Sequence, residues 1–150
     1  MKNSIKIGII LVLILAVAGI YYGKNIYGKK GAERGSAITN NIDEIIKIQD
    51  GKINKPVVME LATTTCPNCR EMYPIMESVN KKYGDKAVVG VIYLDDNRIQ
   101  EKAMDFAKKY SVRVVPTMVF LDEYGQQVIR HEGTMSEEQI INILNQIGVK

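Results

Sequence analysis

The chain has 150 residues, of which 46% are hydrophobic and 25% are charged, values typical of one ordinary globular domain. The formal net charge of +3 is unevenly placed, because residues 1–35 carry six basic side chains and one acidic one, a net charge of +5. The remainder is therefore slightly acidic, at −2, which argues against a nucleic acid partner and suggests that the basic groups serve a membrane.

Residues 1–22 are predicted to form a membrane anchor. The run from residue 7 to 22 contains no charged side chain, and Lys2 and Lys6 precede it. Counted from Ile5, with Tyr21 and Tyr22 at the interface, the run reaches the roughly 17 to 20 residues that cross a bilayer. We therefore expect one transmembrane helix, with residues 5–22 in the membrane.

The alternative for this segment is a cleaved secretory signal, with the small residues 16–18 forming the cleavage site. We favour a retained anchor, since Ile20, Tyr21 and Tyr22 continue the apolar run past that site. More positive charge follows the segment than precedes it, which on its own would keep the domain in the cytoplasm. We expect an extracytoplasmic domain on the cell membrane, because a short basic terminus before an apolar run is how export signals begin.

Residues 23–37 contain four glycines among Lys, Asn and Ser, and this composition predicts a flexible linker. The folded domain is then residues 38–150. Isoleucines recur at helical spacing at positions 38, 42, 45, 46 and 48, and Asp50 and Gly51 end this first predicted helix. After Pro56, the apolar run 57–61 predicts a buried strand.

A helical pattern follows from Cys66 to Gly84, with Pro74 inside it and expected to kink it. Residues 87–94 predict a second buried strand. The side chains of Asp95, Asp96 and Asn97 are expected to cap a helix over about residues 98–110.

Residues 117–121 predict a third strand, and the sequence 122–125 predicts a hairpin turn before a fourth strand at 127–131. Ser136 and Gln139 have the spacing of a capping box at the start of a last helix that runs to Ile147. This order of elements predicts an α/β fold with helices on both faces of the sheet.

Cys66 and Cys69 are the only cysteines, and they stand three residues apart. If Cys66 begins the helix, the two α carbons lie about 5 to 6 Å apart, the separation that a disulfide prefers. The amides and dipole at a helix start favour a thiolate on Cys66, so Cys66 would attack and Cys69 would resolve the mixed disulfide. Pro67 is compatible with this position, because an amide hydrogen in the first helical turn has no acceptor within the helix and its absence costs little.

Two other interpretations of the pair are weaker. A zinc site needs two further nitrogen or sulfur ligands, and only His131 remains, which we expect to be a surface group. A structural disulfide that closes so small a loop would add little stability.

Glu60 interrupts the apolar strand 57–61. If buried, it would have a raised pKa and could relay a proton to or from Cys69. Alternatively, it lies at the margin of the sheet and pairs with a lysine such as Lys86. Pro116 also has two interpretations: a trans proline would end an edge strand, whereas a cis proline would place the Val115 backbone beside the cysteines, where it could bind a substrate chain.

In order and spacing, these residues resemble the thioredoxin family over about residues 38–148. The matching motifs are Glu60, Cys66-Pro67-Asn68-Cys69, Pro74, Val115-Pro116-Thr117 and Gly133. The resemblance implies a thioredoxin-like fold, with a central mixed sheet flanked by helices. It further implies that Cys66 is the nucleophile, Cys69 resolves, Glu60 assists proton transfer and Pro116 is cis.

The chain departs from the thioredoxin pattern beside the cysteines. Thr65 stands where the family has Trp, and Pro67 and Asn68 stand where it has Gly-Pro. Because the central residues help to set the redox poise, these changes leave open whether the protein reduces, oxidises or isomerises disulfides. We expect Thr65, Pro67 and Asn68 to contact the substrate, together with Val115 and Pro116.

The sequence thus predicts a membrane-anchored thiol-disulfide oxidoreductase, first of all a reductase, that acts on protein substrates. An oxidase or isomerase is one alternative, and a tethered redox-sensing or binding module without turnover is another. The resemblance implies an electron donor in the membrane. We expect a monomer with no metal and no cofactor apart from the redox-active disulfide Cys66–Cys69.

Overall fold

The computed structural model describes residues 38–150, so the predicted anchor (1–22) and linker (23–37) lie outside the described residues. The elements, in chain order, are α2 (Ile42–Gln49), β1 (Val57–Ala62), α3 (Pro67–Tyr83), β2 (Val88–Tyr93), α4 (Gln100–Lys109), β3 (Thr117–Leu121), β4 (Gln127–Glu132) and α5 (Glu137–Gln146). Within residues 38–150, none of the helices has the length and apolar character needed to span a bilayer.

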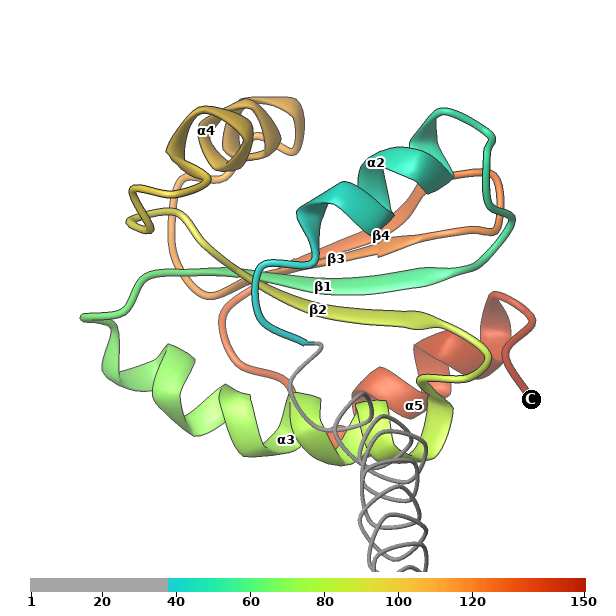
Figure 1. The fold of residues 1–150 in the computed structure, drawn as a ribbon. Coiled ribbons are helices and arrows are strands. Elements are labelled where there is room, and N and C mark those ends of the chain that lie inside the picture. The colour runs from blue at the N-terminus through green and yellow to red at the C-terminus, as the bar shows by residue number, and fades with distance from the viewer. Residues whose placement is uncertain (1–37) are drawn as a thin grey trace, which may run out of the picture. The chain divides into compact units, whose positions relative to one another are not determined.

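The four strands form one mixed sheet, as the resemblance implies, and their order is β2-β1-β3-β4 (Figure 1). β1 pairs with β2 in parallel and with β3 in the antiparallel sense, and β3 pairs with β4 in the antiparallel sense. β1 is therefore a central strand, and all six of its residues are buried. Glu60, in the middle of β1, lies opposite Val91 on β2 and Met118 on β3.

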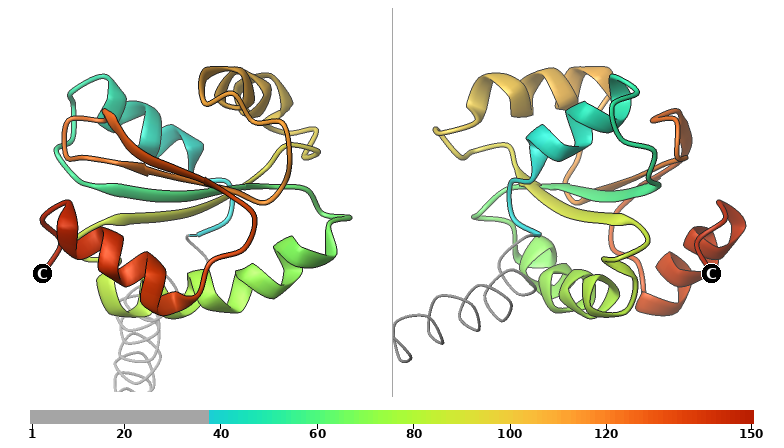
Figure 2. Two further views of the ribbon diagram at one scale, coloured as in Figure 1. Left: turned by 180° about the vertical axis from the view of Figure 1, so that it is seen from behind. Right: turned by 45° about the vertical axis from the view of Figure 1, so that its right-hand side comes forward.

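Helices cover both faces of the sheet, as the order of elements predicts: α2 and α4 lie on one face, and α3 and α5 on the other (Figures 1 and 2). Val58 and Ala62 of β1 pack into the cluster beneath α3 and α5. Val57, Met59 and Leu61 pack into the cluster beneath α2 and α4. Because side chains alternate along a strand, Glu60 projects toward α3, the helix that carries the cysteines.

The first helix begins later than its isoleucine pattern predicts. Ile38 is buried but precedes α2, and Thr39 forms a parallel bridge with Val91 at the free edge of β2. Asn40 has a positive φ of 56°, a conformation that a helix does not allow, so the chain turns here before α2 starts at Ile42. Ile38 matched the helical spacing because it too is buried, but it packs into the cluster beneath α3 and α5, whereas the isoleucines of α2 pack into the cluster on the other face of the sheet.

Local signals at two other chain reversals are confirmed. Ser136 and Gln139 form the reciprocal hydrogen bonds of a capping box at the start of α5. The hairpin turn between β3 and β4 uses the Asp122 carboxylate as acceptor for the backbone amides of Tyr124 and Gln126. Gly125 has a positive φ of 76°, and a Cβ there would lie 2.9 Å from the Gln49 backbone, so the turn requires glycine.

The predicted caps of α4 are wrong. Ile99 occupies the N-cap position and makes no side-chain cap hydrogen bond. Asp96 instead accepts hydrogen bonds from Asn40 and Arg98, and Asp95 accepts them from Thr64. The turn after β2 lies beside the loop after the parallel strand β1, so Asp95 faces that loop. Asp96 also accepts from the Arg98 backbone amide, but Arg98 precedes the N-cap residue Ile99 and is not part of α4.

Candidate active site

Cys66 and Cys69 lie where β1 gives way to α3. Cys66 is the N-cap residue of α3, with an extended backbone, and its Sγ accepts a hydrogen bond from the Cys69 amide at 3.2 Å. Pro67 follows in the first turn, as predicted. The Cys66 sulfur thus takes the place of a capping oxygen at the helix start, where backbone amides lack partners within the helix.

The two thiols differ in exposure. Both are free; Cys66 is half-buried, and only 2% of Cys69 is exposed. Burial, followed by the hydrogen bond with Cys66, raises the pKa of the Cys69 thiol to about 12, although the Thr63 backbone acts in the opposite direction. Cys69 therefore keeps its proton at neutral pH and needs a base before it can attack.

Glu60 is the buried acid beside Cys69. It is 0% exposed, and neither carboxyl oxygen has a hydrogen-bond partner of normal geometry among the described residues. Burial raises the pKa of Glu60 to about 8, and the nearby Cys69 thiol offsets only part of that rise. Within residues 38–150, Glu60 and Thr117 are the only buried polar residues.

The alternative pairing of Glu60 with Lys86 is wrong. The Lys86 ammonium group donates to the Lys150 carbonyl at 2.6 Å. Lys86 precedes β2 and so lies at the opposite end of the sheet from the cysteines, whereas Glu60 points into the core under α3.

The Val115–Pro116 peptide bond is cis. The segment lies against the cysteines, because the Cys66 thiol donates to the Val115 carbonyl at a sulfur–oxygen distance of 3.9 Å. Two hydrogen bonds hold this segment: the Gly133 amide donates to the Pro116 carbonyl at 2.8 Å, and the Thr117 hydroxyl donates to the Val114 carbonyl at 2.7 Å. The start of β3 is thus brought next to the start of α3.

The other predicted site residues lie around Cys66 and Cys69. Thr65, Pro67 and Asn68 are exposed, Val115 is half-buried and Pro116 is buried. Met72, one turn after Cys69 on α3, is wholly buried and belongs to the core. Pro74 lies inside α3, and the kink expected there stays a prediction.

His131 is exposed on β4, which fits the expectation of a surface group. Across residues 38–150, no three His, Cys, Asp or Glu side chains gather in a way that could hold a metal ion.

Four residues near the cysteines were not predicted to belong to the site: Thr63, Thr64, Tyr93 and Asp95. The Thr63 carbonyl accepts from the Cys66 amide at 3.3 Å, and Thr64 binds the Asp95 carboxylate. Burial, followed by the charge of Glu60, raises the pKa of Tyr93, which places this phenol close to the buried acid. Asp95 and Tyr93 could have been found from the sequence, because the carboxyl ends of parallel strands meet at one edge of a sheet.

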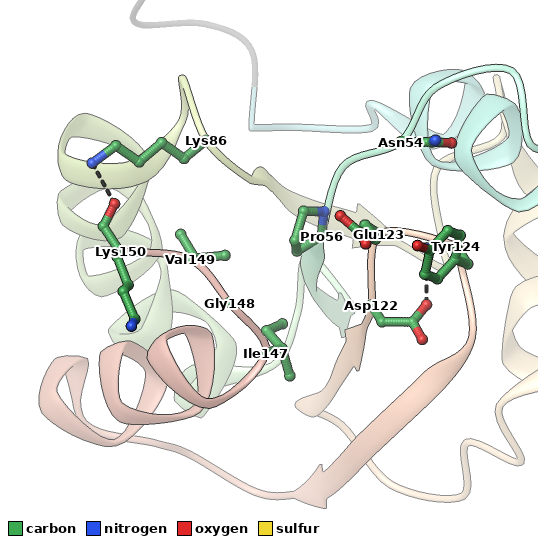
Figure 3. A pocket seen from close by; sticks show the side chains of 10 residues that line it. All are labelled: Asn54, Pro56, Lys86, Asp122, Glu123, Tyr124, Ile147, Gly148, Val149 and Lys150. Atoms are coloured by element: carbon green, nitrogen blue, oxygen red, sulfur yellow. Dashed lines mark hydrogen bonds between the residues drawn. The ribbon is translucent and has the colours of Figure 1, made fainter.

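A cavity of about 470 Å³ lies away from this site (Figure 3). Pro56, Lys86 and Asp122 line it, and they come from the start of β1, the start of β2 and the end of β3. These strand ends are opposite to the end that carries Cys66, so this cavity is separate from the cysteine site.

Comparison with known proteins agrees with this geometry. The family model described as "Thioredoxin-like domain" matches residues 43–148. Thioredoxin-like protein YneN of Bacillus subtilis is 30% identical over 161 aligned positions, which cover 89% of this chain and 92% of that protein. Thiol-disulfide oxidoreductase ResA of Halalkalibacterium halodurans is 21% identical over 90% of this chain and 89% of its own length.

The solved structures include a similar fold with related sequence. A thioredoxin-like protein from Clostridium perfringens is 34% identical with a TM-score of 0.55, over 69% of this chain and 79% of that one. Some relatives are much longer: this chain spans 54% of the length of one curated relative that it matches at 30% identity.

Proposed function

The chain belongs to the thioredoxin family, a family of thiol-disulfide oxidoreductases, and on this premise we propose that it reduces disulfide bonds in protein substrates through Cys66 and Cys69. One observation carries the proposal. The Cys66 sulfur caps α3, 3.2 Å from the Cys69 amide, and lies beside the Val115 carbonyl, while the buried carboxyl group of Glu60 lies near the Cys69 thiol.

In the first step, the Cys66 thiolate attacks one sulfur of a substrate disulfide. A mixed disulfide forms, and the other substrate sulfur leaves as a thiolate that takes up a proton. The Cys69 thiol then gives its proton to the Glu60 carboxylate and attacks the Cys66 sulfur. The second substrate thiol is released, so the substrate gains two electrons and Cys66–Cys69 becomes a disulfide.

The exposed residues around Cys66 give this reaction a docking surface. Thr65, Pro67 and Asn68 are accessible on one side of the sulfur, and the Val115–Pro116 backbone is close on the other. An extended substrate segment that lies against Val115 would bring its disulfide to Cys66, because backbone hydrogen bonds hold such a segment in register.

A complete cycle needs a donor of two electrons to reopen the Cys66–Cys69 disulfide, and no cofactor is required beyond this pair. We propose that the donor is a membrane protein and that residues 5–22 anchor the chain, as a monomer, with its domain outside the cytoplasm. The uncharged run from residue 7 to 22 supports the anchor. Protease treatment of intact cells tests it, since the domain should be digested from outside.

The reduction potential of the pair tests the direction of the reaction. We expect a reduction potential of about −270 mV, which is typical of a reductase, rather than about −120 mV, which is typical of a strong oxidant. Equilibration of the chain with dithiothreitol mixtures of known potential gives this number. A value at the oxidising end would replace the reductase assignment with that of a disulfide oxidase.

A further inference from the structure

Asp95 joins the end of β2 to the loop that carries the cysteines. Both of its carboxylate oxygens lie 3.0 Å from the Thr64 amide, and one lies 2.5 Å from the Thr64 hydroxyl oxygen. Just before this contact, the Leu94 amide donates to the Ala62 carbonyl at 2.9 Å, which continues the pairing of β1 with β2. Asp95 therefore makes three short contacts with one residue, 31 positions away in sequence.

Thr64 follows the residue whose backbone contacts both cysteines. The Thr63 carbonyl accepts a hydrogen bond from the Cys66 amide at 3.3 Å, and the Thr63 backbone lies close enough to the Cys69 thiol to oppose the rise in its pKa. A shift of Thr64 would move Thr63 and hence both of these contacts. The Asp95 carboxylate is thus the outer support of the loop that aligns the two sulfurs.

The neighbouring carboxylate has a different task. Asp96 accepts from the Asn40 amide group at 2.6 Å and from the Arg98 guanidinium at 2.7 Å, and it makes no hydrogen bond with the cysteine loop. Two adjacent acidic residues of the same turn therefore hold two different segments, and only Asp95 holds the active-site loop.

We propose that Asp95 is a positioning residue for the Cys66–Cys69 pair. Its carboxylate fixes Thr64, so that the Thr63 backbone keeps the two sulfurs in the arrangement from which a disulfide closes. The proposal rests on the proposed function of the pair, and it assigns to Asp95 no contact with the substrate. A preorganised pair closes more readily, because less ordering remains to be done when the bond forms.

The test is the equilibrium between the full-length chain and a mixture of reduced and oxidised glutathione, read by alkylation of the free thiols and mass spectrometry. We expect Asp95→Ala to lower the equilibrium constant for disulfide closure roughly three- to tenfold. Asp95→Asn keeps an oxygen acceptor for the Thr64 amide and should restore the value to within about twofold of wild type. Asp96→Ala is the matched control and should also stay within about twofold.

Three results would overturn the proposal: an unchanged equilibrium in Asp95→Ala, an equal fall in Asp96→Ala, or no restoration in Asp95→Asn. If Asp95→Ala does not fold, Thr64→Val carries the test at an exposed position, where a fall of about twofold supports the proposal and no change overturns it. This equilibrium uses no protein substrate. A wild-type chain that closes its disulfide normally but fails to reduce proteins would contradict the proposed function while leaving the role of Asp95 intact.

Discussion

Replacement of Cys66 by Ser is expected to lower the rate of insulin reduction by roughly three orders of magnitude or more. The hydroxyl of Ser is not ionised at neutral pH and cannot attack a disulfide sulfur, so the first step is lost. The variant should fold, because Cys66 is half-buried at a helix N-cap, a position that Ser also favours. Turnover of insulin with dithiothreitol as electron donor measures the effect.

Cys69→Ser is the matched variant of the second step. It keeps the attacking sulfur but removes the resolving one, so it should accumulate a mixed disulfide with the substrate through Cys66. Non-reducing electrophoresis detects this adduct. If wild type reduces insulin no faster than Cys66→Ser does, the pair does not turn over, and the protein would then be a binding or sensing module.

Glu60→Gln is expected to change how stability depends on pH. Burial raises the pKa of Glu60 from 4.5 to about 8 in the folded chain, so the folded state holds a proton that the unfolded state has lost. The contribution is fully present below about pH 4.5 and is lost as pH rises through about 8, with a total on the order of 5 kcal/mol. Gln carries no charge at any pH, so the variant should lack this decline.

Chemical denaturation at about pH 5 and about pH 9 measures the difference in unfolding free energy between the two conditions. Glu101→Gln, at an exposed position in the first turn of α4, is the matched control and should keep the wild-type decline. If wild type and Glu60→Gln lose the same free energy between the two pH values, Glu60 is not a buried acid with a raised pKa.

The same Glu60 variant tests the proton step. Without the carboxylate, Cys69 lacks its nearest base, so resolution of the mixed disulfide should slow by roughly a hundredfold, within the usual range for general base catalysis. The attack by Cys66 should be nearly unchanged. Stopped-flow measurement of the two steps separates them, and equal slowing of both would point to a structural effect.

The secondary structure follows from local patterns wherever side-chain burial and chain reversal agree. β2, and β1 apart from Glu60, are apolar runs because both of their faces are covered, and Ser136 and Gln139 mark the start of α5 by their spacing alone. Ile38 shows where this reasoning ends. Periodicity records that a side chain is buried, but it does not say whether a helix or a strand-like segment brought it there.

The site was predictable where the residues that form it are close together in the sequence. Cys66 and Cys69 are one turn apart, so their proximity follows from the helix. The sequence places Glu60 in the middle of a strand, but it does not show whether the carboxyl group is paired with a lysine. That depends on which side chains of α3 pack against it in the fold.

Asp95 was assigned to a cap for a related reason. A carboxylate before a helical pattern usually serves that helix, and its contact with Thr64 exists only because β1 and β2 are parallel neighbours. Sequence reasoning that includes the order of the strands could have placed the two turns side by side.

The most direct test of the redox pair is the order in which the two thiols react. The reduced full-length chain is treated with limiting iodoacetamide at about pH 7, and the labelled peptides are mapped. We predict that the label is found on Cys66 alone, because Cys69 is 2% exposed and its pKa is raised to about 12. Label on Cys69 before Cys66, or equal label on both, would contradict the assignment of Cys66 as the attacking sulfur and Cys69 as the resolving sulfur.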